Sequence, residues 1–492
     1  MKAKETNVKI VTVAIFIATF MTAIEGTIVS TAMPTIIGSL HGLSIMNWVF
    51  SIYLLTNAMM TPIYGKLADK IGRKKIFIIG ILIFIIGSSM CGLSQNMLHL
   101  IVSRAIQGVG AGAIMPVALT IIADIYPVNK RAKVLGFNNA AWGIASVFGP
   151  LFGGFIVDTL SWHWIFLINV PIGIILIFLI SHYFVEPKRE VKTKEPVDFL
   201  GSGLLMATLM LLLYGFQTIA DSGSMSLASS LYLFLAVVLF IWFILVEKQA
   251  KDPVISLQLF QNPTFVVVNI VAALVSGFLI GIEVYMPMWM QGVLGLNAAM
   301  GGIVLAPMSI TWIGGSFLGG KLMESLDTKK VLGIGIGFIL IGGMCLWLVP
   351  ASTSYSVFLM ISVILGIGLG VTITTTTVKA QNSVAHEVLG VATSFNTLAR
   401  TLGQTLMVSI FGVIFNQTLA AEMMSRSQQG VSQELLNKLV NPHTANEIPA
   451  DLLEPLKGLL YTALHTVYFC GLLLLIVAFL FNFLQKDRRK QN

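Results

Sequence analysis

The chain alternates between long apolar stretches and short charged segments. Each apolar stretch is long enough to cross a hydrocarbon core of roughly 30 Å as a helix, and helices satisfy every backbone polar group inside lipid. The pattern therefore predicts an all-α polytopic membrane protein with fourteen transmembrane helices. These fall near residues 9–33, 46–65, 76–94, 98–124, 134–157, 163–184, 198–218, 227–246, 264–289, 296–320, 329–349, 355–378, 389–416 and 458–484.

The positive charges indicate how this bundle is oriented. Lys and Arg gather in short loops on the cytoplasmic side of a membrane. With both termini placed in the cytoplasm, 25 of the 30 Lys and Arg residues lie on that side. The net charge of +8 then reflects topology, and it gives no reason to expect a nucleic-acid partner.

Composition adds that this is no soluble domain, since 56% of the 492 residues are hydrophobic and 11% are charged. The first apolar stretch lacks a small-residue cleavage site, so we expect a retained helix rather than a signal peptide. The cysteines show no CxxC spacing, and we expect neither a metal site nor a disulfide framework. They are Cys91, Cys345 and Cys470.

The two ends of the chain resemble each other. Glu25 matches Glu283 at an offset of 258 residues, and the three glycines of GVGAG at 108–112 match those of GIGLG at 366–370 at the same offset. Six spans in each copy make the repeats parallel, related by a pseudo-twofold axis along the membrane normal. In such repeats the substrate site lies between the halves.

The repeat divides the chain into three parts. Residues 1–184 form an N-terminal six-helix bundle, and residues 263–492 form a C-terminal one. The linker 185–262 carries two extra helices, for which we expect a peripheral packing role. Residues 417–457 form a long external loop, which we expect to be a solvated connector, with a partly ordered cap over the exit as the alternative.

Four ionisable residues lie inside predicted spans: Glu25, Arg104, Glu283 and Arg400. An ionisable group at mid-membrane depth costs roughly 2.5 to 3.5 kcal/mol, so such groups usually mark a pathway for ions or substrates. The alternative is that they form interhelical pairs that hold the bundle together. This alternative is strongest for the arginines, because guanidinium groups bind neighbouring helices readily.

Five motifs connect the chain to a known family. The loop GKLADKIGRKK at 65–75 resembles the signature loop of the major facilitator superfamily, and LIVSRAIQGVGAG at 100–112 resembles its fourth-span motif. GIASVFGPLFGG at 143–154 resembles the fifth-span motif of its drug/proton antiporters. TIVSTAMP at 27–34 and WHWIFLINVPIG at 162–173 look like the fourteen-span multidrug branch, which implies the major facilitator fold plus two inserted helices.

The resemblance implies roles for several residues. Gly65, Asp69, Gly72 and Arg73 would form a cytoplasmic latch, with Asp124 as the partner of Arg73. Arg104 would take part in proton transfer. The bend and close-contact face of the antiporter helix would consist of Gly143, Gly149, Pro150, Gly153 and Gly154.

Glu25 is our expected proton site, because a carboxyl in a low-dielectric cavity can hold a proton near neutral pH. The family usually has an Asp here, so this chain keeps the acid with one more methylene. Glu283 is expected to recognise a cation or to be a second proton site. Trp289 is expected in an interfacial aromatic belt. The expected cavity comprises both acids with Tyr285, Met286, Asn138, Asn396, Gln404 and Arg400, although each amide could instead bond a neighbouring helix.

Together these features predict a proton-coupled exporter of amphipathic, cationic drugs that works by alternating access. An exporter or flippase of one native metabolite or lipid is the alternative. We expect no enzyme, because no nucleophile, base and orienting group cluster within the spans, and no sensor, because no soluble domain is attached. We expect no cofactor besides the coupling proton, and only small amphipathic substrates and lipid as partners. The chain is expected to act as a monomer in a bacterial cell membrane.

Overall fold

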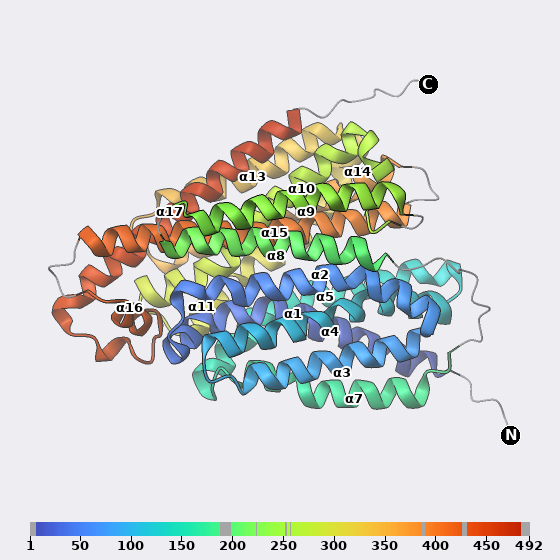
Figure 1. Cartoon of the computed structure of the whole chain (residues 1–492), viewed down its shortest axis with the longest axis horizontal. Coiled ribbons are helices and arrows are strands. Elements are labelled where there is room, and N and C mark those ends of the chain that lie inside the picture. Colours follow the sequence, from blue (N-terminus) through green and yellow to red (C-terminus); the bar gives the residue numbers. More distant parts are fainter. Residues whose placement is uncertain are drawn as a thin grey trace.

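The computed structural model describes residues 6–186, 198–222, 224–250, 253–255, 257–384, 389–425 and 431–483. These residues form helices and no strands. Figure 1 shows two bundles side by side, with the start of α1 (Val8–Leu40) and the end of α17 (Ala450–Phe483) at the same end of the molecule. We call this the terminal end, and the opposite one the distal end.

The predicted spans are found as helices. Thirteen helices are long and apolar enough to cross a membrane among the described residues. The fifth predicted span is a further helix, α5, whose side chains are only partly described. The helices of the N-terminal bundle are α1 (Val8–Leu40), α2 (Met46–Ile71), α3 (Arg73–Gly92), α4 (Met97–Ile125), α5 (Val128–Thr159), α6 (Trp164–Leu167) and α7 (Asn169–Tyr183).

The remaining helices follow the same order as the predicted spans. Two of those spans are each divided into two helices, α6 with α7 and α11 with α12. The helices are α8 (Phe199–Ser222), α9 (Leu227–Gln249), α10 (Pro263–Met288), the π-helical turn η3 (Trp289–Val293), α11 (Ala298–Ile303), α12 (Ala306–Ser325), α13 (Thr328–Leu348), α14 (Tyr355–Asn382), α15 (Leu389–Ser425), α16 (Gln433–Val440) and α17 (Ala450–Phe483).

Polar residues in the short loops begin several of these helices. The Asn7 side chain accepts a hydrogen bond from the backbone of α1, and Asn96 does the same for α4. Asn262 caps α10, where Pro263 occupies the first turn and so needs no intrahelical partner for a backbone N–H. The apolar runs therefore supply the helices, and the caps help to fix where they start.

The sequence repeat is also a repeat of packing contacts. A β carbon on Gly108 would meet Thr56 Oγ1 and the carbonyl of Tyr53, and one on Gly366 would meet Thr311 Oγ1 and the carbonyl of Met308. The glycines therefore bring α4 against α2 in one half and α14 against α12 in the other. Close helix approach of this kind requires small residues.

The inserted helices contact both halves. Trp48 of α2 donates a hydrogen bond to Gln217 of α8 at 3.0 Å, and Gln417 of α15 donates to the carbonyl of Ile219 at 3.4 Å. In Figure 1, α8 runs along the boundary between the bundles. The insertion thus packs against the seam between the halves, and α9 lies outside it with few buried residues.

The distal loop differs from the expected connector. Helix α15 continues to Ser425 and α17 begins at Ala450, so part of the range 417–457 is helical. Between them, α16 buries Leu436, Leu439 and Val440 against α17, η3 and the distal end of α1. The described part of this loop is therefore a packed cap, because the apolar face of α16 finds a partner there.

Candidate functional site

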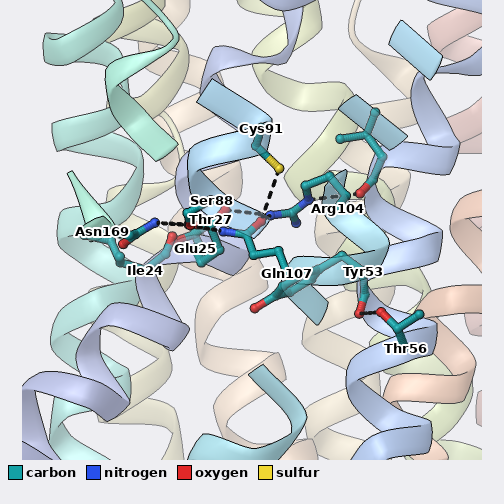
Figure 2. Close-up of polar contacts among 11 residues, drawn as sticks. Ile24, Glu25, Thr27, Tyr53, Thr56, Ser88, Cys91, Arg104, Gln107 and Asn169 are labelled. Atoms are coloured by element: carbon teal, nitrogen blue, oxygen red, sulfur yellow. Dashed lines mark hydrogen bonds and ion pairs between the residues drawn. The ribbon is translucent and has the colours of Figure 1, made fainter. Parts of the chain in front are cut away.

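A buried ion pair joins α1 to α4 in the N-terminal bundle. Arg104 Nη1 lies 2.6 Å from Glu25 Oε1, and the two residues are 1% and 0% exposed. Figure 2 shows Asn169, at the start of α7, on the other side of the carboxylate, where its amide donates to Glu25 Oε2 at 2.8 Å. The carboxylate is thus satisfied on both oxygens.

Arg104 has partners besides the acid. Its Nη1 also donates to Gln107 Oε1 at 2.7 Å, and its Nε donates to the carbonyl of Val49 at 3.2 Å. The guanidinium carbon lies 3.9 Å from the centre of the Tyr53 ring, a cation–π distance. Protonation of Glu25 would therefore leave the Arg104 charge with three other contacts.

Sequence reasoning found the acid and the arginine but not the groups that orient them. Gln107 follows Arg104 by three residues, on the same helix face, and its amide donates to Ser88 Oγ at 2.6 Å. Asn169 also donates to Ser88, at 3.2 Å. Both amides lie within motifs noted above, and a helical wheel of α4 would have found Gln107.

Glu283 has a different environment from Glu25. Among residues 275–293 it is the only one that is not buried. Among the described residues it has no hydrogen-bond or ion-pair partner. Arg400 is also partly exposed and makes one long hydrogen bond, from Nε to Ser276 Oγ at 3.4 Å. A partly exposed carboxylate and a partly exposed guanidinium therefore lie in the C-terminal bundle, whereas Glu25, expected to line the cavity as well, is fully buried in this conformation.

The other expected cavity residues are mostly enclosed. Tyr285 and Met286 are buried, and the Tyr285 hydroxyl donates to Asn47 Oδ1 of α2 at 2.9 Å. Asn396 donates to Asn269 Oδ1 at 2.9 Å, which fits the alternative that it bonds a neighbouring helix. Gln404 is partly exposed. Asn138 lies outside the described side chains.

The expectation of an aromatic belt is wrong for Trp289. Its side chain is 0% exposed and lies inside the C-terminal bundle. Its ring centre is 5.6 Å from that of Phe358, 5.3 Å from that of Tyr461 and 5.7 Å from that of Tyr468. The residue belongs to the core because rings from α14 and α17 enclose it.

Arg73 and Asp124 of the expected latch meet at the terminal end. Arg73 Nη1 lies 2.5 Å from Asp124 Oδ1, the partner expected from sequence. Gly72 has φ of 113°, a conformation that favours glycine, and it places the Arg73 backbone N–H 2.6 Å from Glu186 Oε1. Sequence reasoning missed Glu186. A β carbon on Gly65 would meet nothing, and the Asp69 side chain lies outside the described part.

The expected antiporter helix, α5, packs closely on two neighbours. Side chains at Gly149 and Gly153 would collide with Thr27 and Ile28 of α1, and one at Gly154 would collide with the backbone of Ala298 and Ala299 in the other half. The carbonyl of Pro150 touches Gly302. Gly143 lies outside the described side chains.

Hydrogen bonds between described residues of the two halves lie in the distal part of the helices. Gln291 donates to the carbonyl of Thr31 at 3.1 Å, and Asn416 donates to that of Ser44 at 2.6 Å. The Asp158 carboxylate accepts from the backbone N–H groups at the start of α11, and the hydroxyls of Ser51 and Ser409 lie 2.9 Å apart. We call these contacts the distal seal.

Comparison with known proteins agrees with this architecture. The family model of the Major Facilitator Superfamily matches residues 15–408. The chain is 33% identical to the multidrug transporter protein MdtP of Bacillus subtilis, over 100% of this chain and 95% of that protein. It is 30% identical to the multidrug efflux pump SdrM of Staphylococcus aureus, over 82% and 89%.

Among solved structures, the fold resembles a bacterial homologue of the human lysosomal transporter Spinster in an inward-facing, occupied conformation. The TM-score is 0.70 at 18% identity, with 96% of each chain covered. The helices, the packing repeat and these similarities agree, and the chain is a multi-pass membrane transporter rather than an enzyme. It belongs to the Major Facilitator Superfamily, alongside relatives that are multidrug efflux transporters.

Proposed function

We propose that the protein exports amphipathic, cationic drugs from the cytoplasm in exchange for protons, by alternating access of two six-helix bundles. The observation that carries this proposal is the sealed Glu25–Arg104 pair. A carboxylate with a full set of partners in a dry interior is suited to one exchangeable proton, because Arg104 retains other contacts when the acid is neutral. The relatives named as multidrug transporters support efflux as the direction.

The proposal also fixes the orientation. The terminal end faces the cytoplasm of a bacterial cell, in its plasma membrane, and the distal end faces outward. The distal seal then corresponds to an inward-facing state. The protein works as a monomer, with protons as the coupling ion, no other cofactor, and lipid and small amphipathic molecules as its partners.

Dye transport into everted vesicles with an acidic interior tests the proposal. Wild-type protein should concentrate ethidium or rhodamine B, and a proton ionophore should abolish the uptake. Glu25→Gln should lose the proton-driven uptake at equal protein level, whereas Glu324→Gln, which removes an exposed acid at the terminal end, should retain it. Equal proton-driven uptake by Glu25→Gln and wild type would overturn the proton site. Failure of wild type to move any dye would favour a dedicated exporter of one native compound.

A further inference from the structure

The equivalent acids of the two halves, Glu25 and Glu283, lie in different environments. The offset that relates Glu25 to Glu283 relates Arg104 to Ser362. Ser362 donates its hydroxyl to the carbonyl of Val304 at 2.7 Å. The C-terminal bundle therefore has no arginine at the position that neutralises the acid in the N-terminal bundle, and Glu283 must find its positive charge elsewhere.

The solvent access of Glu283 is internal. Its neighbours along α10 and η3, from Val275 to Val293, are all buried, so this helix is enclosed by protein on every side. Exposure confined to a single acid within such a helix indicates an internal, water-accessible space.

Arg400 lies on the same side of α10 as Glu283. Its guanidinium reaches Ser276, which precedes Glu283 by seven residues, about two helical turns on the same face. Seven residues rise about 10 Å along a helix, so the two charges lie at different depths. No ion pair joins them, and the hydrogen bond of Arg400 goes to Ser276 instead. Thr397, Thr401 and Gln404, neighbours of Arg400 on α15, are also polar and not fully buried, which is typical of a face toward water rather than lipid.

We infer that Glu283 and Arg400 form a two-pole binding site for amphipathic molecules that carry both a cation and an anion on one apolar frame. This inference rests on the proposed function and refines its substrate class. A simple cation pairs with Glu283 alone and leaves the Arg400 charge without a partner, whereas a zwitterion pairs with both residues and leaves the site neutral. Charge-assisted hydrogen bonds at both poles then replace the water that each group loses.

Equilibrium binding tests this inference without requiring transport. Fluorescence anisotropy of rhodamine B, a zwitterion at neutral pH, is compared with that of its ethyl ester, a cation of nearly the same shape, on the purified full-length protein. The wild type should bind rhodamine B at least tenfold more tightly than the ester. Arg400→Gln should weaken rhodamine B binding at least tenfold and leave ester binding unchanged or stronger. Glu283→Gln should weaken binding of both dyes.

Two controls separate the possible outcomes. Lys321→Gln removes an exposed positive charge at the terminal end and should leave the preference unchanged. Arg400→Lys, which keeps the positive charge, should retain part of the preference for rhodamine B over its ester. A wild-type preference for the ester, or an equal loss of both dyes in Arg400→Gln, would overturn the inference. Selective binding without proton-driven transport would uphold the site and count against the proposed function instead.

Discussion

At the scale of single residues, the same side chain at equivalent repeat positions has two environments. Glu25 is enclosed with Arg104 and Asn169, whereas Glu283 is partly exposed and has no partner among the described residues. The difference follows from the replacement of an arginine by Ser362 in the second copy. In our proposals, Glu25 holds the coupling proton and Glu283 meets the ligand.

The buried pair should be strongly coupled. Removing one partner of a buried ion pair leaves the other charge buried and unpaired, which lowers the free energy of unfolding by about 3 to 5 kcal/mol. We predict that Glu25→Gln and Arg104→Gln each lower the free energy of unfolding by about 3 kcal/mol, and that the double variant loses much less than the sum. Denaturation of the purified variants in mild detergent would measure this. Additive losses would show that the pair is not coupled.

Asn169 should orient the acid rather than merely fill space. We predict that Asn169→Leu reduces proton-driven transport at least tenfold and changes its pH profile, because Glu25 loses a donor at 2.8 Å. Asn169→Ser, which retains a hydroxyl donor, should recover part of the activity. Transport assayed over a range of pH at matched protein levels tests this. An unchanged pH profile in Asn169→Leu would assign the residue to packing alone.

Some of these site residues could be predicted from the sequence, and others could not. Charges inside apolar stretches are conspicuous, so Glu25 and Arg104 could be predicted. The Arg73–Asp124 pair was expected only because the family resemblance implied it. Asn169 and Glu186 could not be predicted, because an amide near a helix end or an acid beyond one carries no periodic signal. Their partners come from helices that are distant in sequence.

At the scale of elements, α1 connects the proposed proton site to the distal seal. It carries Glu25 in its middle and, six residues further, Thr31, whose carbonyl accepts a hydrogen bond from the other half. Helix α5 packs closely against the same part of α1 through its glycines. A change of charge at Glu25 therefore acts on the helix that holds the seal. Sequence predicted the close-contact face of α5, whereas it did not show that α16 packs on α1.

The α5 contact gives a prediction with a matched control. Gly154→Leu should reduce transport more than tenfold, because its β carbon would meet the backbone of Ala299 and the halves could no longer close there. Gly314→Leu also adds a side chain to a helix glycine, but in open space, and should be tolerated. Transport at matched expression would distinguish them. Equal effects of the two substitutions would argue against a role of α5 in closing the distal end.

At the scale of the whole molecule, the distal seal predicts a conformational lock. Ser51 and Ser409 lie in opposite halves with hydroxyls 2.9 Å apart, so cysteines at both positions are within reach of a disulfide. Oxidation of the Ser51→Cys/Ser409→Cys variant should stop transport and preserve dye binding, and reduction should restore transport. Each single-cysteine variant is the control. Continued transport by the fully oxidised protein would contradict opening at this end.

The overall architecture was largely predictable, because the length, polarity and repeat of the apolar stretches specify fourteen helices in two parallel copies. Which end is closed was not predictable. Hydrophobic periodicity places residues within a bundle, and the balance between two arrangements of the same bundles depends on contacts between them.

The most direct test of the account is proton release on substrate binding. Rhodamine B is added to the purified protein in weakly buffered detergent solution, and a pH indicator records the protons released. We predict release by the wild type and by Glu324→Gln, and none by Glu25→Gln, with all three proteins still binding the dye. Equal release by Glu25→Gln, or no release by the wild type despite dye binding, would contradict the exchange of substrate for a proton at Glu25.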